Sequence, residues 1–203
     1  MNNPSPPRLE SAIRLALAPL LRAEGFVGSG RRFHQCVGPW IQIITVQGSR
    51  YGGSFAVNLG IHFASAPDLA GNPPDPKKMS EAHCEFRRRL SDSNADRWWK
   101  HEPDHASMLT AVESAASVYA HFGRRYFELA CADLNAITPE ALSSGTYDLQ
   151  GFGTTKVRLG LALARIRKLQ GRSDESREFA QYAVQHVGSA TALESELRVL
   201  AAT

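Results

Sequence analysis

The stretch SFAVNLGIHFA, residues 54–64, decides the fold. Large apolar residues occupy every second position, and small or polar residues stand between them. Because side chains alternate between the two faces of a β-strand, this spacing predicts a strand with one face against a hydrophobic layer. The other face, which carries Asn58 and His62, is expected to face solvent, and the floor of a binding groove is the alternative. The apolar face consists of Phe55, Val57, Leu59, Ile61 and Phe63.

Turn signals divide the neighbouring sequence into further strands. Residues 31–37 and 40–47 are separated by Gly38-Pro39, a strong turn signal. Together with residues 54–64 they predict a three-stranded antiparallel meander. A fourth strand is expected in AHCEFRRRL, residues 82–90, and its one face would carry Cys84, Phe86, Arg88 and Leu90.

Helices are predicted on both sides of these strands. Residues 9–26 have apolar side chains at helical spacing, and Pro19 is expected to kink this helix and Gly25 to end it. Residues 106–137 predict one long helix, or two helices broken near Gly123, and a helical hairpin and a final helix follow. The predicted fold class is therefore α+β, in which an antiparallel sheet of about four strands carries an N-terminal helix and a helical C-terminal half.

The bulk composition is that of an ordinary globular protein. A chain of 203 residues, 43% hydrophobic and 21% charged, fits one domain with a sizeable core. We predict a disordered tail at residues 1–8 and a single domain over 9–203, with helix and sheet in 9–104 and the packed helical part in 105–203. The apolar runs are too short to cross a bilayer, and the N-terminus lacks the order of a signal peptide, so a cytoplasmic location is expected.

The letters HEPDH, residues 101–105, fit the H-E-x-x-H pattern of zinc proteases. In that pattern both histidines reach the metal from one face of an unbroken helix. Pro103 has no amide hydrogen and its ring clashes within a helix, so it belongs in the first turn of a helix that begins near Asp104. We therefore interpret HEPDH as a chance match and predict no metal site. Nor does the sequence contain a nucleophile elbow or a P-loop, so neither a catalytic residue nor a cofactor is predicted.

Arginines at 87–89 and tryptophans at 98–99 are the other residues of interest. Adjacent residues in an extended segment point in opposite directions, so we expect one tryptophan in the core and one at the surface, where it would be a binding anchor. Arg88 shares its predicted face with apolar residues, and a partly buried arginine needs an acidic partner or an anionic ligand. A structural ion pair is favoured, with its acid supplied locally by Glu85, Asp92 or Asp96.

Several short motifs in the first half resemble a known family. They are the helix that ends in Gly25-Phe26, the strand that begins with Phe33, Gln47-x-Ser49, FxVNLGI at 55–61, Arg89-Leu90 and Trp98-Trp99. Through them residues 9–100 resemble a family of mostly bacterial proteins known as domain of unknown function 4304, and VNLGI is the most specific part. The resemblance implies a shared α+β fold and no established activity, and it leaves HEPDH outside.

In the absence of a catalytic signature, the favoured interpretation is a non-catalytic protein-binding module, either an immunity-type inhibitor or an adaptor. The alternative is an unrecognised enzyme or small-molecule binder with a site between sheet and helices. A concave pocket that gathers the polar groups would favour the alternative, whereas a flat sheet with an exposed Trp98 would favour a protein partner. The candidate binding residues are Gln47, Asn58, His62, Arg87, Arg88, Arg89 and Trp98.

A nucleic-acid partner is not expected. The net charge of +3 is mild, whereas nucleic-acid binders usually concentrate basic residues together with a recognisable motif. Such a partner would require the arginines of 87–89, 124–125 and 158–172 to merge into one patch.

Overall fold

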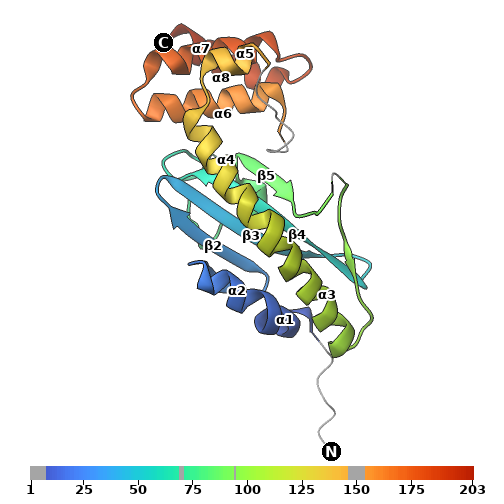
Figure 1. Cartoon of the computed structure of the whole chain (residues 1–203). Helices are drawn as coiled ribbons and strands as arrows, with labels where there is room; N and C mark the ends of the chain where they lie inside the picture. Colours follow the sequence, from blue (N-terminus) through green and yellow to red (C-terminus); the bar gives the residue numbers. More distant parts are fainter. Residues whose placement is uncertain (1–7, 69–70, 94, 146–153) are drawn as a thin grey trace, which may run out of the picture.

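The computed structural model describes residues 8–68, 71–93, 95–145 and 154–203. A six-stranded antiparallel sheet carries helices on one face, and a group of helices follows at the C-terminal end (Figure 1). The predicted α+β class is confirmed. Of the expected tail, residues 1–7 lie outside the described residues, and Arg8 directly precedes the first helix in an extended conformation.

The N-terminal helix contains a wide turn next to its proline. It runs through α1 (Leu9–Ala12), the π-helical η1 (Ile13–Leu17) and α2 (Ala18–Ala23). Pro19 has no N–H to donate, and a wider turn before it accommodates its ring, so the expected kink takes the form of a π-helical segment. Gly25 ends the helix as predicted, with a φ of 96°, and the N–H of Phe26 donates to the carbonyl of Leu21 over 3.0 Å.

The sheet has the predicted meander at its centre. Its strands β1 (Val27–Ser29), β2 (Arg32–Val37), β3 (Trp40–Gly48), β4 (Ser54–Phe63) and β5 (Phe86–Arg89) are neighbours in chain order. A further strand, β6 (Trp99–Lys100), pairs with the start of β4. The two strands beyond the expected four, β1 and β6, are only three and two residues long. Alternation cannot be recognised over so few residues, which is why the sequence did not indicate them.

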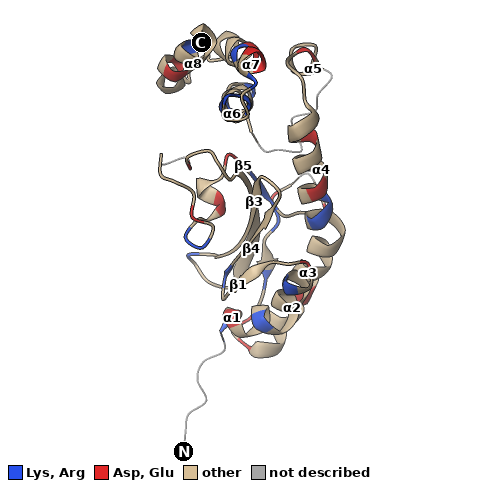
Figure 2. Ribbon diagram, turned by 90° about the vertical axis from the view of Figure 1, so that its left-hand side faces the viewer, with Lys and Arg blue, Asp and Glu red and all other residues tan. Residues whose placement is uncertain are grey.

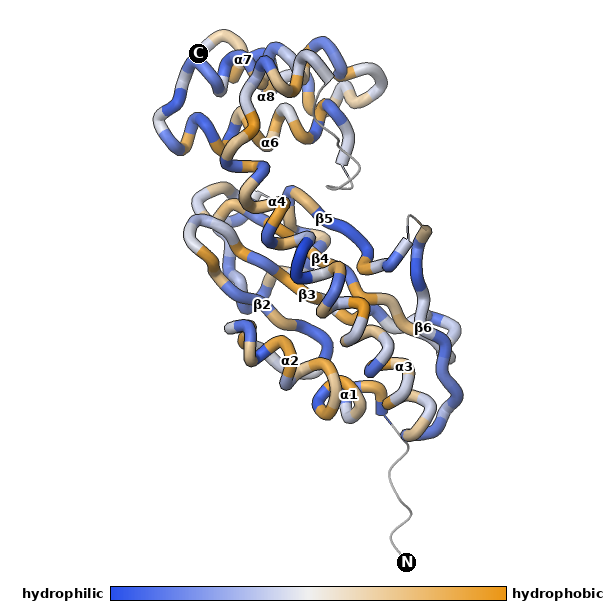
Figure 3. Tube along the Cα trace, in the orientation of Figure 1, coloured by the Kyte–Doolittle hydropathy of each residue, from blue (hydrophilic) through white to orange (hydrophobic). Residues whose placement is uncertain are grey.

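The inner face of the sheet is the predicted apolar one. Phe55, Val57, Leu59, Ile61 and Phe63 are all buried in the main core, and Figure 3 shows apolar stretches along β3 and β4, beside the long helix. The covering helix runs without interruption through α3 (His105–Val118), the π-helical η3 (Tyr119–Gly123) and α4 (Arg124–Ala136). Of the two alternatives for residues 106–137, the single long helix is therefore confirmed. A Cβ at Gly123 would collide with the ring of Tyr119, so the close packing in this turn requires glycine.

The outer face of the sheet is partly covered, so the expectation that Asn58 and His62 face solvent was wrong. The short helix η2 (Glu81–His83), which precedes β5, packs against β3, β4 and β5. A Cβ at Gly60 would lie 2.7 Å from the sulfur of Cys84. The small residues of β4 therefore provide room for this short helix, and Asn58 and His62 are buried, with 6% and 0% exposed.

The C-terminal helices form a layer of their own. They are α5 (Pro139–Ser143), α6 (Lys156–Leu169), α7 (Ser173–Gln185), the 3-10 helix η5 (Thr191–Leu193) and α8 (Glu194–Ala202). The helical hairpin of α6 and α7 turns at Gly171, whose φ is 75°. At Gly160 a Cβ would lie 2.9 Å from that of Ala183, so the two helices approach closely.

One buried arginine joins this layer to the rest of the molecule. Arg167 of α6 has no exposed surface and donates to the carbonyl oxygens of Leu134, Asn135 and Ile137 at the end of α4. These carbonyls have no partners within the helix, so the guanidinium acts as a cap. A second link is the ion pair of Arg165 with Glu85, 3.1 Å long, next to β5.

Candidate functional site

Two pockets lie on opposite sides of β5 because its side chains alternate between the faces of the sheet. Arg87 and Arg89 pair with Gly60 and Asn58 of β4 and therefore lie on the outer face. Arg88 pairs with Leu59 and lies on the inner face with Phe86. The predicted grouping was wrong for Cys84, which precedes the strand and packs on the outer face against Gly60, because η2 interrupts the expected alternation.

The pocket on the outer face of the sheet, called the outer pocket below, has a volume of about 390 Å³ and is open and polar. It brings together five of the predicted binding residues, which come from three neighbouring strands. Glu81 of η2 and Asp96 complete its walls. The lining residues are Gln47, Asn58, Glu81, Arg87, Arg88, Arg89 and Asp96.

A hydrogen-bond network fixes most of the polar groups in the outer pocket. The side-chain amide of Asn58 donates to Gln47 Oε1 over 3.0 Å and to Glu81 Oε1 over 3.2 Å. Arg89 donates from Nε to Asn58 Oδ1 over 3.3 Å, and its Nη1 pairs with Asp96 over 2.8 Å. These groups satisfy one another, so they form a fixed wall and few of them remain to bind a ligand.

Arg87 is the exception in the outer pocket. Its side chain is exposed and makes no ion pair or hydrogen bond with any residue in the described part of the chain. Glu81 Oε2 is buried and also has no hydrogen-bond partner there. Among the described residues, the pocket therefore offers the unpaired cation of Arg87 and the unpartnered Oε2 of Glu81 beside a network whose other polar groups bind one another.

The two tryptophans divide as predicted between core and surface. Trp99 is 4% exposed, stacks on Phe55 at 5.7 Å and donates from its indole N–H to Ser114 over 3.3 Å. Trp98 is 37% exposed, and the guanidinium of Arg89 lies 4.9 Å from the centre of its ring. This cation–π contact places Trp98 at the rim of the outer pocket.

His62 does not join this site. It lies further along β4, beneath the turn that follows the strand, and its Nε2 is 2.9 Å from the carbonyl oxygen of Ala66. Its Nδ1 is buried and has no partner among the described residues. Its place on the outer face was predicted correctly, but it is fully buried and does not line the outer pocket.

The HEPDH segment is the start of α3. Asp104 is its N-cap and accepts from the N–H of Ser107 over 2.8 Å, and the helix begins at His105. Pro103 lies one residue before the cap, slightly outside the first turn that the sequence indicated. The two histidines do not share a helical face, and the described residues contain no group of three or more His, Cys, Asp or Glu side chains placed to hold a metal.

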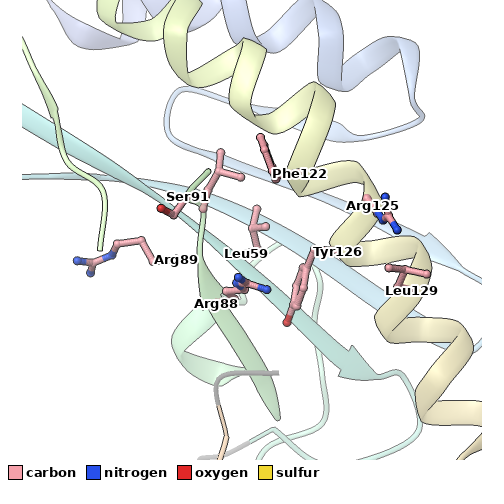
Figure 4. A pocket seen from close by; sticks show the side chains of 9 residues that line it. Leu59, Arg88, Arg89, Ser91, Phe122, Arg125, Tyr126 and Leu129 are labelled. Atoms are coloured by element: carbon pink, nitrogen blue, oxygen red, sulfur yellow. The ribbon is translucent and has the colours of Figure 1, made fainter. Parts of the chain in front are cut away.

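The second pocket, the inner pocket, lies between β5 and the long helix and has a volume of about 210 Å³ (Figure 4). Its sheet side carries Arg88, and its helix side carries Tyr126. Figure 4 shows these two side chains extending toward each other, and the guanidinium carbon of Arg88 is 5.9 Å from the ring centre of Tyr126. The lining residues are Leu59, Arg88, Arg89, Leu90, Ser91, Phe122, Arg125, Tyr126 and Leu129.

The prediction that Arg88 forms an ion pair with a nearby acid was wrong. Each of the three acids proposed for it pairs with another arginine: Glu85 with Arg165, Asp92 with Arg97 and Asp96 with Arg89. Arg88 itself has no acidic partner within the described residues. The sequence correctly placed these acids nearby, but the inward direction of Arg88 takes it away from them.

Tyr126 is buried with its hydroxyl unpartnered among the described residues. Burial raises the pKa of Tyr126 well above its ordinary value, although the positive charge of Arg88 opposes this. The hydroxyl therefore remains protonated at neutral pH and is a hydrogen-bond donor facing a cationic neighbour.

Tyr126, Arg125, Glu81 and Asp96 were not among the predicted site residues. The two helical residues lie far in sequence from the strands, and only the packing of α4 brings them to β5. Adjacent Arg125 and Tyr126 in an otherwise amphipathic helix were a weak signal. Glu81 was hidden because the segment before β5 showed no periodicity that would place it over the sheet.

Most of the other arginines considered for a nucleic-acid patch, those of 124–125 and 158–172, form ion pairs with acidic side chains. Arg124 binds Glu24, Arg165 binds Glu85 and Glu196, and Arg172 binds Glu175. Figure 2 shows acidic segments of α7 and α8 near the basic α6. The basic residues therefore lie beside acidic ones.

The chain was compared with known families, curated proteins and solved structures. The family model described as Domain of unknown function (DUF4304) matches residues 17–121, more than half of the chain. This range contains every residue of the outer pocket, as well as Trp98. No curated protein and no solved structure matches the chain. In the described part of the chain, no helix is long and apolar enough to span a membrane.

Proposed function

The chain belongs to the DUF4304 family, and from this starting point we propose that it is a non-catalytic protein-binding module of the immunity or adaptor type, acting in the cytoplasm of a bacterium. Its contact surface is the outer pocket with Trp98 at the rim. The partner presents an acidic segment, in which a carboxylate binds Arg87 and a neighbouring apolar side chain packs on Trp98.

The observation that carries this proposal is the guanidinium of Arg87, which is unpaired among the described residues and lies on the same face of β5 as Arg89. The guanidinium of Arg89 in turn lies 4.9 Å from the ring centre of the exposed Trp98. Tryptophan and arginine are the residues most enriched where binding energy concentrates in protein interfaces. The charge of Arg87 is unpaired among the described residues, and a partner carboxylate would supply its counterion.

The closed network of the outer pocket supports a protein partner over a small molecule at this place. A small-molecule site needs several polar groups that converge on the ligand. Here Gln47, Asn58 and Arg89 bind one another, so only the rim groups are available. An open rim with one cation and one aromatic ring suits a side chain presented by another protein.

Affinity capture of the tagged full-length chain from its host tests the proposal. We expect one stoichiometric partner with the wild-type chain, and about tenfold less of it with Arg87→Gln, because a charge-assisted hydrogen bond contributes about 1.5–3 kcal/mol. Trp98→Ala should also lose the partner. Arg125→Gln is the matched control, because it removes an exposed arginine outside the outer pocket and should retain the partner.

Peptides from the captured partner then identify the contact. A peptide with an acidic segment should bind the wild-type chain, and its affinity should fall when its Asp and Glu are changed to Asn and Gln. The proposal is wrong if the chain elutes alone, or if Arg87→Gln and Trp98→Ala retain the partner as the wild type does.

A further inference from the structure

The inner pocket combines positive charge with the absence of any acidic lining residue. Three arginines, Arg88, Arg89 and Arg125, border it, and none of the described residues that line it is an aspartate or glutamate. Arg89 is neutralised from the outer side by Asp96. Arg88 and Arg125 have no ion pair with any residue that the structure describes. A cation held against apolar side chains without a counterion favours the binding of an anion.

Tyr126 adds a second, independent sign of a missing acceptor. It is 8% exposed, and its hydroxyl is buried without a hydrogen-bond partner among the described residues. A buried hydroxyl usually finds a partner, since leaving it unsatisfied is costly. Because the hydroxyl and the guanidinium of Arg88 both need an acceptor, one anionic group between them would satisfy both.

Apart from Ser91, the rest of the inner pocket is apolar. Leu59 and Leu90 form its inner wall, while Phe122 and Leu129 of the long helix are each 49% exposed at its edge. Large apolar side chains in this position leave surface that a ligand could cover. The pocket thus has a cationic, donor-bearing part and an apolar part.

We infer that the inner pocket binds a small organic carboxylate with a compact apolar body. The carboxylate accepts from Arg88 and from the hydroxyl of Tyr126, and the apolar body lies against Phe122 and Leu129. The volume of about 210 Å³ is below the range of about 300–1,000 Å³ that is usual for ligand pockets, which fits a molecule of this small size and is too little for a nucleotide. Arg88 and Arg89 line both pockets, but this site lies on the inner face of β5 and does not depend on the function proposed for the outer pocket.

Benzoate and benzamide are matched probes for this site, because they share shape and differ in charge. Titration calorimetry of the full chain should show benzoate binding with a Kd of about 1 mM or tighter, a modest affinity for so few atoms. Benzamide should bind at least about tenfold more weakly, because it lacks the charge that Arg88 requires. Inorganic phosphate should also bind more weakly than benzoate, since it cannot use the apolar wall.

Substitutions on neighbouring residues separate this pocket from the outer one. Arg88→Gln should weaken benzoate about tenfold and Tyr126→Phe about threefold, as expected for a charged and a neutral hydrogen bond. Arg87→Gln is the control, because it alters the adjacent arginine on the opposite face and should leave benzoate binding within about twofold, the usual independence of separated sites. Phe122→Ala, which truncates an exposed side chain, should weaken benzoate and leave phosphate unchanged.

The inference is overturned if benzoate does not bind, or if benzamide or phosphate binds as tightly as benzoate. It is also overturned if Arg88→Gln, shown to be folded by its circular dichroism and melting curve, binds benzoate like the wild type. Loss of benzoate binding in Arg87→Gln would likewise contradict the assignment, because it would place the anion on the outer face.

Discussion

The guanidinium of Arg167 donates to the carbonyl oxygen of Leu134 over 3.1 Å. The two residues lie 33 positions apart in the chain, and their contact joins α6 to α4. Two further carbonyls, those of Asn135 and Ile137, accept from the same nitrogen. The last carbonyls of a helix must find donors from outside it, and here a fully buried side chain provides them. The C-terminal helices are therefore attached to the sheet-bearing part through a polar contact.

Arg167→Met should loosen that attachment. The substitution keeps much of the apolar volume but leaves three carbonyls without their donor, and we expect a loss of about 3 kcal/mol in the free energy of unfolding. Urea denaturation measures the loss, and hydrogen exchange should locate it in α6 and α7. Arg198→Met, which breaks an exposed pair with Glu194, should cost less than about 1 kcal/mol. Equal effects of the two substitutions would contradict a capping role.

Gly60→Ala should lift η2 from the sheet. The added Cβ would lie 2.7 Å from the sulfur of Cys84 and 3.0 Å from the Cα of Glu81, so we expect a cost of about 1–3 kcal/mol from overpacking. Cys84 should then react faster with a thiol reagent. The double variant with Cys84→Ala should recover part of the lost stability, and the absence of any recovery would show that the strain lies elsewhere.

The stability of the protein should fall at alkaline pH. Burial raises the pKa of the Cys84 thiol and of Tyr126 above their ordinary values of 9.0 and 10.0. The folded state therefore holds these protons more tightly than the unfolded state. The resulting stability is fully present below the ordinary values and is lost as the pH rises toward the raised ones.

Urea midpoints measured from pH 7 upward should accordingly decline above about pH 9, where unfolded thiols ionise. Tyr126→Phe should reduce the decline above pH 10, because it removes one of the protons concerned. Tyr51→Phe, at a side chain that is 83% exposed, should leave the curve unchanged. The same decline in Tyr126→Phe as in the wild type would refute the contribution of Tyr126.

Asp104→Ala tests the interpretation of HEPDH as a helix start. Loss of the N-cap should cost about 1 kcal/mol, the typical effect of replacing such a residue. His101→Ala should have a smaller effect, and zinc should not raise the melting temperature of the wild type. A rise with zinc that disappears in His101→Ala would instead restore the metal hypothesis.

Much of the fold was predictable because its signals are local. The alternation in residues 54–64 identified β4 and its core face, and Gly25 correctly ended the first helix. Trp98 and Trp99 divided between surface and core for the same reason, since neighbouring extended residues point in opposite directions. The α+β class followed from the order of these elements.

The candidate sites were less predictable because they depend on contacts between distant segments. Gln47, Asn58 and Arg89 were named from their strand positions, and antiparallel pairing brought them together. The cover over the outer face was missed because residues 64–85 lack periodicity, and the partner of Arg88 was assigned incorrectly. Tyr126 reaches Arg88 only through the packing of a helix on β5, which no local pattern encodes.

The π-helical turn at Tyr119–Gly123 changes the direction around the helix axis in which the side chains of α4 point. One additional residue in a helix rotates all later side chains by about 100° around the axis relative to an unbroken α-helix. That rotation is part of how Tyr126 comes to face β5 while the end of α4 meets Arg167. Deletion of a single residue in this turn would rotate Tyr126 away from β5 and the end of α4 away from Arg167. The number of residues in this turn is therefore constrained, as well as their identity.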